Sequence, residues 1–186
     1  MDNFLKIARN FALAEQARTS MPLLQHIDLS RKVALRLAKK LGADELVVES
    51  GIYLMNCMIG EALKQNRLQN HIKMSADKTI ELFEHLDISQ KNKDNIINCV
   101  LEHHGARKFY SLESEICCNA DCYRFVSIKG FTYALRFLRD MSFGDLIKLL
   151  NNKLDEKWGV LTLDICKKEL TPQYKIIQQF LNNLVG

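Results

Sequence analysis

The stretch Gly51-Ile-Tyr-Leu-Met-Asn-Cys-Met-Ile-Gly60 is apolar on nearly every side. It lies inside a predicted helix from about Glu45 to Leu63, which Asp44 can cap and which follows Gly42, a natural end for the preceding helix. An α-helix that is hydrophobic all round has no face that suits water, so it belongs in the middle of a core. The sequence therefore predicts a fold organised around this helix.

Helical spacing of apolar residues recurs on both sides of this stretch, whereas the alternating runs typical of strands are hard to find. Only two prolines and eight glycines interrupt the 186 residues. The further helices predicted are one over about residues 4–14, one over 33–41, one that Ser75 caps and that runs to Leu86, one from Ser89 to His103-His104-Gly105, one over 112–126, apolar stripes at 135–138 and 146–154, and a last helix that opens at Pro172 with Thr171 as its cap. Residues 106–111 and 158–170 are the least helical. The predicted fold class is all-α.

The length suits a single domain. We expect one helical domain over residues 1–186, with a core at about 20–140 and a helical extension at about 141–186. A composition of 47% hydrophobic and 26% charged residues is typical of a globular protein that folds in water. No sequence feature indicates an oligomeric state.

The charge is mild, at +4 from 26 basic and 22 acidic residues that are scattered along the chain. Such scattering argues against nucleic-acid binding as a main function. We find neither a signal peptide nor the roughly 18 apolar residues of a membrane span, so we expect no membrane association. The six cysteines are then expected to be reduced thiols in a cytoplasmic protein. The cluster at 117, 118 and 122 lacks a second pair at zinc-ribbon spacing and favours buried small side chains.

A few polar residues are placed where chemistry is possible. His26, His71, His103 and His104 lie at or near predicted helix ends, and Asp121 lies inside a helix between apolar neighbours. A buried carboxylate is costly unless it is paired or bound to a metal. Imidazoles and a carboxylate from different helices can hold a divalent ion in a bundle core. Histidines at helix ends are also common as surface or capping residues, so spacing alone leaves both interpretations open.

Read in order, the chain resembles the HD superfamily of metal-dependent phosphohydrolases. In active members, one block reads Leu-Leu-His-Asp-Ile-Gly and the last reads Asp-Ala-Asp followed by a basic residue. The segments that carry the resemblance are His26, Val33-Ala-Leu-Arg-Leu-Ala38, Gly42-Ala-Asp44, Ile59-Gly-Glu-Ala62, His71-Ile-Lys-Met-Ser75, Leu101-Glu-His-His-Gly105, Asn119-Ala-Asp121 and Phe143-Gly-Asp-Leu-Ile-Lys-Leu-Leu150.

The resemblance implies a compact multi-helix bundle that holds one or two divalent ions, such as Mg, Mn, Fe, Co, Ni or Zn. It implies action on a phosphate-containing small molecule, either a nucleotide or another phosphate ester. By position, His26 matches the first metal ligand, His71 and His104 match the intermediate histidines, and Asp121 matches the last carboxylate. Counting back from Ile59-Gly60 instead puts the first ligand near Asp28.

The central pair departs from the family pattern. Alignment on Ile59-Gly60 places Cys57 at the His position and Met58 at the Asp position. A cysteine thiolate can bind a soft or borderline metal, but a neutral thioether cannot replace a carboxylate toward Mg or Mn. We therefore expect weak metal binding or none, and weak or lost hydrolysis. The alternative is a non-catalytic ligand-binding, regulatory or protein-interaction module on the same fold.

Overall fold

The computed structural model describes residues 3–185, and over this range it consists of helices and their connections, without a β-strand. The all-α prediction is confirmed. The elements are α1 (Asn3–Thr19), α2 (Leu24–Leu41), α3 (Glu45–Leu54), α4 (Ile59–Lys64), η1 (Leu68–Asn70), α5 (His71–Phe83), α6 (Gln90–Leu101), α7 (Leu112–Val126), α8 (Ile128–Ala134), η2 (Leu135–Arg139), α9 (Phe143–Gly159) and α10 (Asp164–Val185).

Several helix ends lie where the local sequence places them. The Asp44 side chain accepts hydrogen bonds from the backbone N–H groups of Leu46 and Val47 at the start of α3. Ser89 caps α6 in the same way. Gly42 ends α2 with a left-handed φ of 74°, a conformation that glycine adopts without steric cost. These ends depend on contacts between residues close in sequence, which is why the sequence predicts them.

The apolar stretch forms α3 and the turn after it, and the predicted single helix over 45–63 is wrong in one respect. The helix ends at Leu54 and a new one, α4, begins at Ile59. Within the turn, the N–H of Cys57 bonds to the carbonyl of Leu54 and the N–H of Ile59 to that of Asn56, three residues back rather than four. This tighter winding breaks the helix without a glycine or proline.

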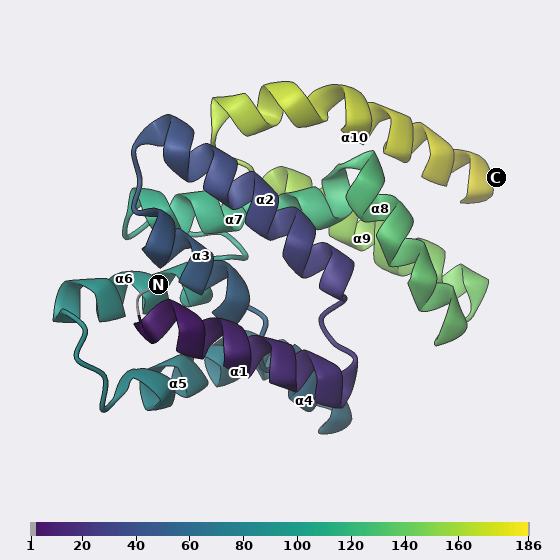
Figure 1. Cartoon of the computed structure of the whole chain (residues 1–186). Coiled ribbons are helices and arrows are strands. Elements are labelled where there is room, and N and C mark those ends of the chain that lie inside the picture. Colours follow the sequence, from purple (N-terminus) through teal and green to yellow (C-terminus); the bar gives the residue numbers. More distant parts are fainter. Residues whose placement is uncertain (1–2, 186) are drawn as a thin grey trace.

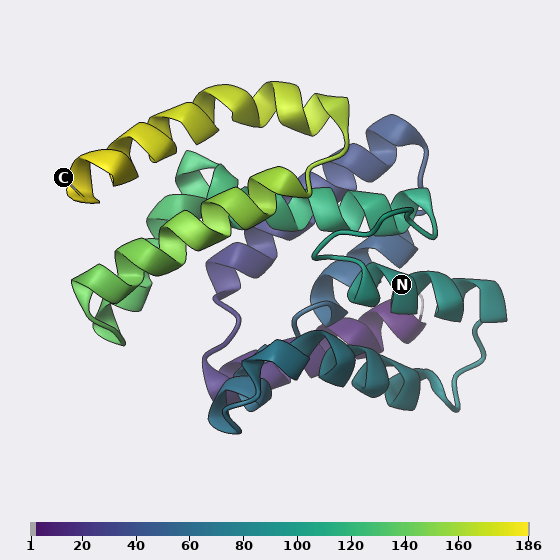
Figure 2. The ribbon, with the colours of Figure 1, turned by 180° about the vertical axis from the view of Figure 1, so that it is seen from behind.

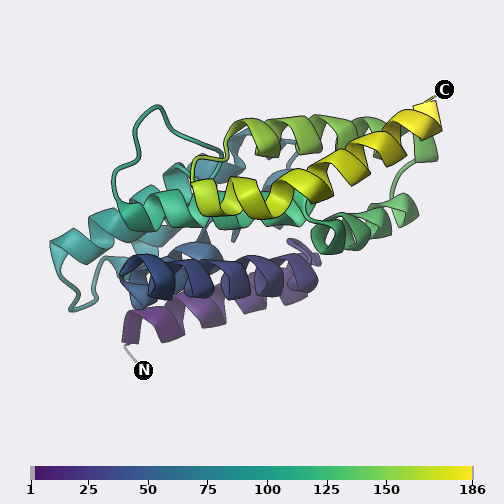
Figure 3. The ribbon, with the colours of Figure 1, turned by 90° about the horizontal axis from the view of Figure 1, so that it is seen from above.

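The central position of this stretch is confirmed, but α7 shares it. Helix α3 packs against α1, α2, α6 and α7, and α7 packs in turn against α2, α8, α9 and α10. Twelve of the fifteen residues of α7 are buried. Viewed from above, α7 lies between α1 and α2 on one side and α9 and α10 on the other (Figure 3). The core therefore has two central helices, which together position the candidate site.

One expectation about membranes needs correction. The segment Glu45–Lys64 is long and apolar enough, by length and composition alone, to cross a membrane. However, 67% of the 18-residue apolar window in this segment is buried inside the bundle. The central helix of a globular core passes the same test, and the packing of α3 accounts for its composition.

Two predicted helix starts are also wrong. Ser75 lies inside α5 instead of capping it, and its hydroxyl accepts a hydrogen bond from the backbone N–H of Met58. Pro172 and Thr171 lie well inside α10, which begins at Asp164. Most of residues 158–170 is accordingly helical, whereas the predicted loop over 106–111 is confirmed.

The C-terminal helices belong to the same packed body as the rest. A single hydrophobic cluster runs from Phe4 in α1 to Leu181 in α10. Helix α10 extends along one side of the molecule above α2 and α8 (Figure 1), and the view from behind shows α9 beside it (Figure 2). Through α9, this C-terminal part reaches the centre of the bundle.

Candidate metal centre

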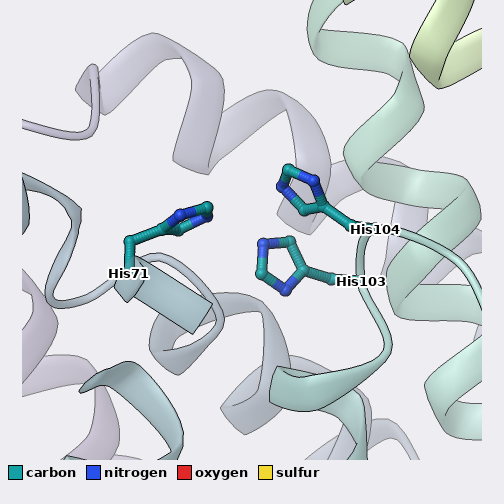
Figure 4. A group of neighbouring side chains, drawn as sticks. All are labelled: His71, His103 and His104. Carbon is teal, nitrogen blue, oxygen red and sulfur yellow. The ribbon is translucent and has the colours of Figure 1, made fainter. Parts of the chain in front are cut away.

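Three histidines, from the start of α5 and from the turn after α6, lie close together beside α7. His71 is the first residue of α5, and His103 and His104 lie in the turn after α6. Their ring centroids are 4.5 Å apart for His103 and His104, 5.2 Å for His71 and His104, and 5.8 Å for His71 and His103. Each ring offers one ligand atom such that the three atoms lie within 4.8 Å of one another. The rings turn toward a shared space (Figure 4).

Each of these rings is fixed through its Nδ1 atom. His71 Nδ1 lies 2.8 Å from the carbonyl of Leu68, and His103 Nδ1 lies 2.7 Å from that of Val100. His104 Nδ1 lies 2.9 Å from a carboxylate oxygen of Glu156. Because carbonyl oxygens only accept, Nδ1 of His71 and His103 must carry the proton and Nε2 must present a lone pair. Metal-bound histidines are typically oriented by this kind of second hydrogen bond.

The Nε2 atoms of two of these histidines are in an unusual state for a buried site without water. Nε2 of His71 and Nε2 of His103 are both buried without a hydrogen-bond partner. Buried polar atoms are normally satisfied, so unpaired ones need an explanation. Burial lowers the pKa of His71 to about 4 and that of His103 well below its ordinary value. Both rings are therefore neutral at pH 7, the form in which imidazole binds a metal ion.

Asp121 lies in α7 next to this group and is completely buried, but its carboxylate is already paired. Oδ1 accepts a hydrogen bond from Arg124 Nη1 at 2.7 Å, and Oδ2 lies 2.7 Å from Lys157 Nζ. Burial alone would raise the pKa of Asp121, but Lys157 and Arg124 outweigh it and hold the pKa well below its ordinary value. The amide Nδ2 of Asn56 lies 3.5 Å from Oδ1.

His26 does not join the three histidines. It lies in the first turn of α2, where Nε2 donates to the carbonyl of Gly130 at 3.0 Å and the ring packs against Phe125. Together with Arg124, it lines a cavity of about 10 Å³. Asp28, the alternative first ligand, is exposed and pairs with Lys32.

Cys57 does not join the histidine group either. The Cys57 thiol is within hydrogen-bonding reach of Ser75 in α5, and burial raises its pKa to about 12. Without a metal beside it Cys57 is therefore a protonated thiol, and its sulfur is not among the ligand atoms that group with the three histidines. Met58 packs against the hydrophobic core. The residue of this turn whose side chain reaches Asp121 is Asn56.

The structure thus brings together two of the four residues proposed as metal ligands, His71 and His104, and adds His103. Asp121 lies next to these histidines. His26 is separate from them and lies near Arg124, which pairs with Asp121. Sequence reasoning missed the roles of His103, Asn56, Arg124 and Lys157. His103 had a signal, since it stands beside His104 at a helix end, whereas the contact between Lys157 and Asp121 has none in the pattern of either helix.

The comparisons with known proteins agree on the fold. A Lactobacillus plantarum protein of known structure aligns with a TM-score of 0.73 at 16% identity, covering 99% of this chain and 96% of its own. Bacillus subtilis YpgQ in complex with ADP aligns with a TM-score of 0.66 at 16% identity, covering 97% and 94%. A predicted HD superfamily hydrolase from an uncultured Thermotogales bacterium aligns with a TM-score of 0.64 at 12% identity, covering 98% and 89%.

These similarities extend over nearly the whole length of both chains, and the fold is HD-like. No protein-family model and no curated protein sequence matches the chain.

Proposed function

We propose that this chain is a divergent HD-fold protein that binds one transition-metal ion through His71, His103 and His104. In this proposal, a phosphate-containing small molecule binds at that ion, and its hydrolysis is strongly weakened or lost. The observation that carries the proposal is the pair of buried, unpartnered Nε2 atoms on His71 and His103. Lone pairs suit a cation, whereas a phosphate oxygen would be repelled by them.

The ligand set favours a particular class of metal. Imidazole suits Zn, Fe, Ni and Cu, whereas Mg and Mn prefer carboxylate, carbonyl and water oxygens. Three imidazole ligands bring no negative charge to a divalent ion and leave at least one coordination position open. Both properties favour a phosphate oxygen as the next ligand. The ADP complex of YpgQ, a protein of similar fold, supports a nucleotide as the first molecule to test.

We expect weak or absent hydrolysis because residues that the family pattern requires are missing from this chain. Such a reaction needs a cation that neutralises the phosphate oxygens and a group that activates water. Here the positions aligned with the His-Asp pair hold Cys57 and Met58, which supply no carboxylate. The Asp121 carboxylate is held by Lys157 and Arg124.

A second candidate is a phosphohydrolase that works from an ion on the three histidines together with Glu156. It is favoured by Glu156, whose carboxylate contacts His104 and is partly exposed. Burial would raise the pKa of Glu156, but its contacts with His104 and Lys153 outweigh it and hold the pKa below the ordinary value. In this candidate the carboxylate therefore orients His104 and accepts a hydrogen bond from the attacking water. This candidate differs from the first in predicting turnover that depends on Glu156.

The experiment combines metal analysis, binding and turnover on the purified chain. We expect about one zinc per chain after equilibration, as a single three-histidine site requires, and calorimetric binding of ADP that disappears with a chelator. His71→Ala and His103→Ala should lose both, whereas His85→Ala, whose side chain is 91% exposed, should keep both. A chain that binds no metal would refute the proposal. Turnover of phosphate esters that Glu156→Gln abolishes would establish the second candidate instead.

A further inference from the structure

Lys157 is a lysine in an unusual place. It lies near the end of α9, yet only 1% of its side chain is exposed. Its Nζ lies 2.7 Å from Asp121 Oδ2, and 3.5 Å from both Glu156 Oε1 and the carbonyl oxygen of His103. Three oxygen atoms from α7, α9 and the turn after α6 therefore surround one buried ammonium group. Oxygen atoms from several elements around one positive centre are also what a bound cation would require.

The charge of Asp121 is compensated without any ion. The carboxylate has Lys157 on one oxygen and Arg124 on the other, and both cations are nearly inaccessible to water. Burial alone would lower the pKa of Lys157, but the Asp121 carboxylate outweighs it and raises the pKa. The lysine is thus positively charged. A divalent ion placed against the same carboxylate would meet two fixed positive charges at close range, and repulsion is strong where water is excluded.

We propose that Lys157 is an internal cation that takes the place of a metal ion beside Asp121 and confines metal binding to the three histidines. Lys157 then supplies a permanent positive charge where α7 meets α9, so that the Asp121 carboxylate is compensated without a metal ion. The role of Lys157 beside Asp121 does not depend on the histidine site, whereas the confinement of metal binding to the histidines rests on the proposed function.

The test removes the charge while keeping the shape of the side chain. In chelator-treated protein, Lys157→Met should lower the melting temperature by roughly 10 °C, since it leaves a buried carboxylate partly unpaired. Added Mn²⁺ should restore roughly 5 °C or more at saturating concentration, because the ion takes the vacated place. Electron paramagnetic resonance should count more bound Mn²⁺ in this variant than in the wild type.

Matched variants assign the effect to Asp121. Lys157→Met combined with Asp121→Asn should bind no more Mn²⁺ than the wild type. Because this double variant keeps the three histidines, its Mn²⁺ content is the background from any ion that they hold. Lys157→Arg keeps the charge and should behave as the wild type does toward Mn²⁺. An ordinary structural ion pair would give the loss of stability without the gain of Mn²⁺ binding, and that result would overturn the proposal.

A measurement on the wild-type chain keeps the test valid if Lys157→Met does not fold. Side-chain ammonium groups that are buried and hydrogen-bonded exchange their protons slowly and can be observed by ¹⁵N nuclear magnetic resonance. The ¹⁵N signal of the Lys157 ammonium is assigned as the one that disappears in Lys157→Arg. This signal should be present in metal-free protein and should persist at saturating Zn²⁺. Loss of that signal on zinc binding would mean that the metal displaces the ammonium, and the proposal would be wrong.

Discussion

At the scale of single residues, the orientation of the side chains around Asp121 determines whether restoring the His-Asp pair at positions 57 and 58 can restore metal binding. Cys57 faces Ser75 in α5, and Lys157 already binds Asp121. We therefore expect Cys57→His combined with Met58→Asp to bind no more metal than the wild type. Elemental analysis after equilibration with Mn²⁺ or Zn²⁺ measures this directly.

A control separates the two causes of that expected failure. If the ammonium blocks the site, adding Lys157→Met to the double variant should raise the metal content. If the direction of position 57 is the obstacle, the triple variant should still bind no extra ion at the new pair. A double variant that gains an ion by itself, and loses it again with Asp121→Asn, would contradict the assignment of Lys157 as the bound cation.

The candidate site could be predicted from the sequence only in part, for reasons that differ from residue to residue. His71, His104 and Asp121 are polar groups in otherwise apolar surroundings, which marks them as residues that need partners. Nothing in the sequence shows that Lys157, 36 positions after Asp121, supplies one of those partners, because the contact depends on how α9 packs against α7. Asn56 was missed because the helix break shifts which residue of the turn faces Asp121.

At the level of elements, Pro172 marks a helix that is less stable than it could be. It lies in the interior of α10, where its ring lacks the N–H that the carbonyl of Lys168 would accept from. We expect Pro172→Ala to stabilise the chain by about 1–3 kcal/mol, since an interior proline costs about 3 kcal/mol and part of that is offset by the freer unfolded chain. The melting temperature should rise by roughly 2–4 °C per kcal/mol.

The control for this prediction is Lys168→Ala, an exposed change in the same turn that leaves the backbone intact. It should alter the free energy of unfolding by less than about 0.5 kcal/mol. If Pro172→Ala destabilises the chain, the proline must be favoured by a bend in α10 that its packing on α7 and α9 requires.

The elements that the sequence predicts correctly are those with local signals. Asp44 and Ser89 bond to N–H groups two or three residues ahead, and the cap residues are visible without knowledge of the fold. The end of α3 at Leu54 has no such signal, because its cause is the packing of the following turn. Pro172 gave a misleading signal, because prolines favour first turns but tolerate an interior position when the flanking turns are held by tertiary contacts.

For the whole molecule, the question is whether residues 141–186 form an appendage or part of the same cooperative unit. The hydrophobic cluster includes Leu150 and Leu154 of α9, and Leu170 and Leu181 of α10, all nearly inaccessible to water. Lys157 links α9 to α7 through a buried ion pair. Both kinds of contact would be lost if the C-terminal helices detached while the remainder stayed folded.

Trp158 allows this to be measured, because it is the one tryptophan of the chain and stacks on Tyr174 with the ring centroids 4.4 Å apart. Its fluorescence reports the contact of α9 with α10, whereas far-ultraviolet circular dichroism reports all helices. If residues 3–185 form a single cooperative unit, the two signals should follow the same transition in urea, with equal midpoints and slopes. An earlier fluorescence transition would show that the C-terminal helices unfold separately, and Lys157 would then lose its burial before the core does. Asp121 would then face a solvated lysine, and the difference between the midpoints would measure how firmly the bundle holds its internal cation.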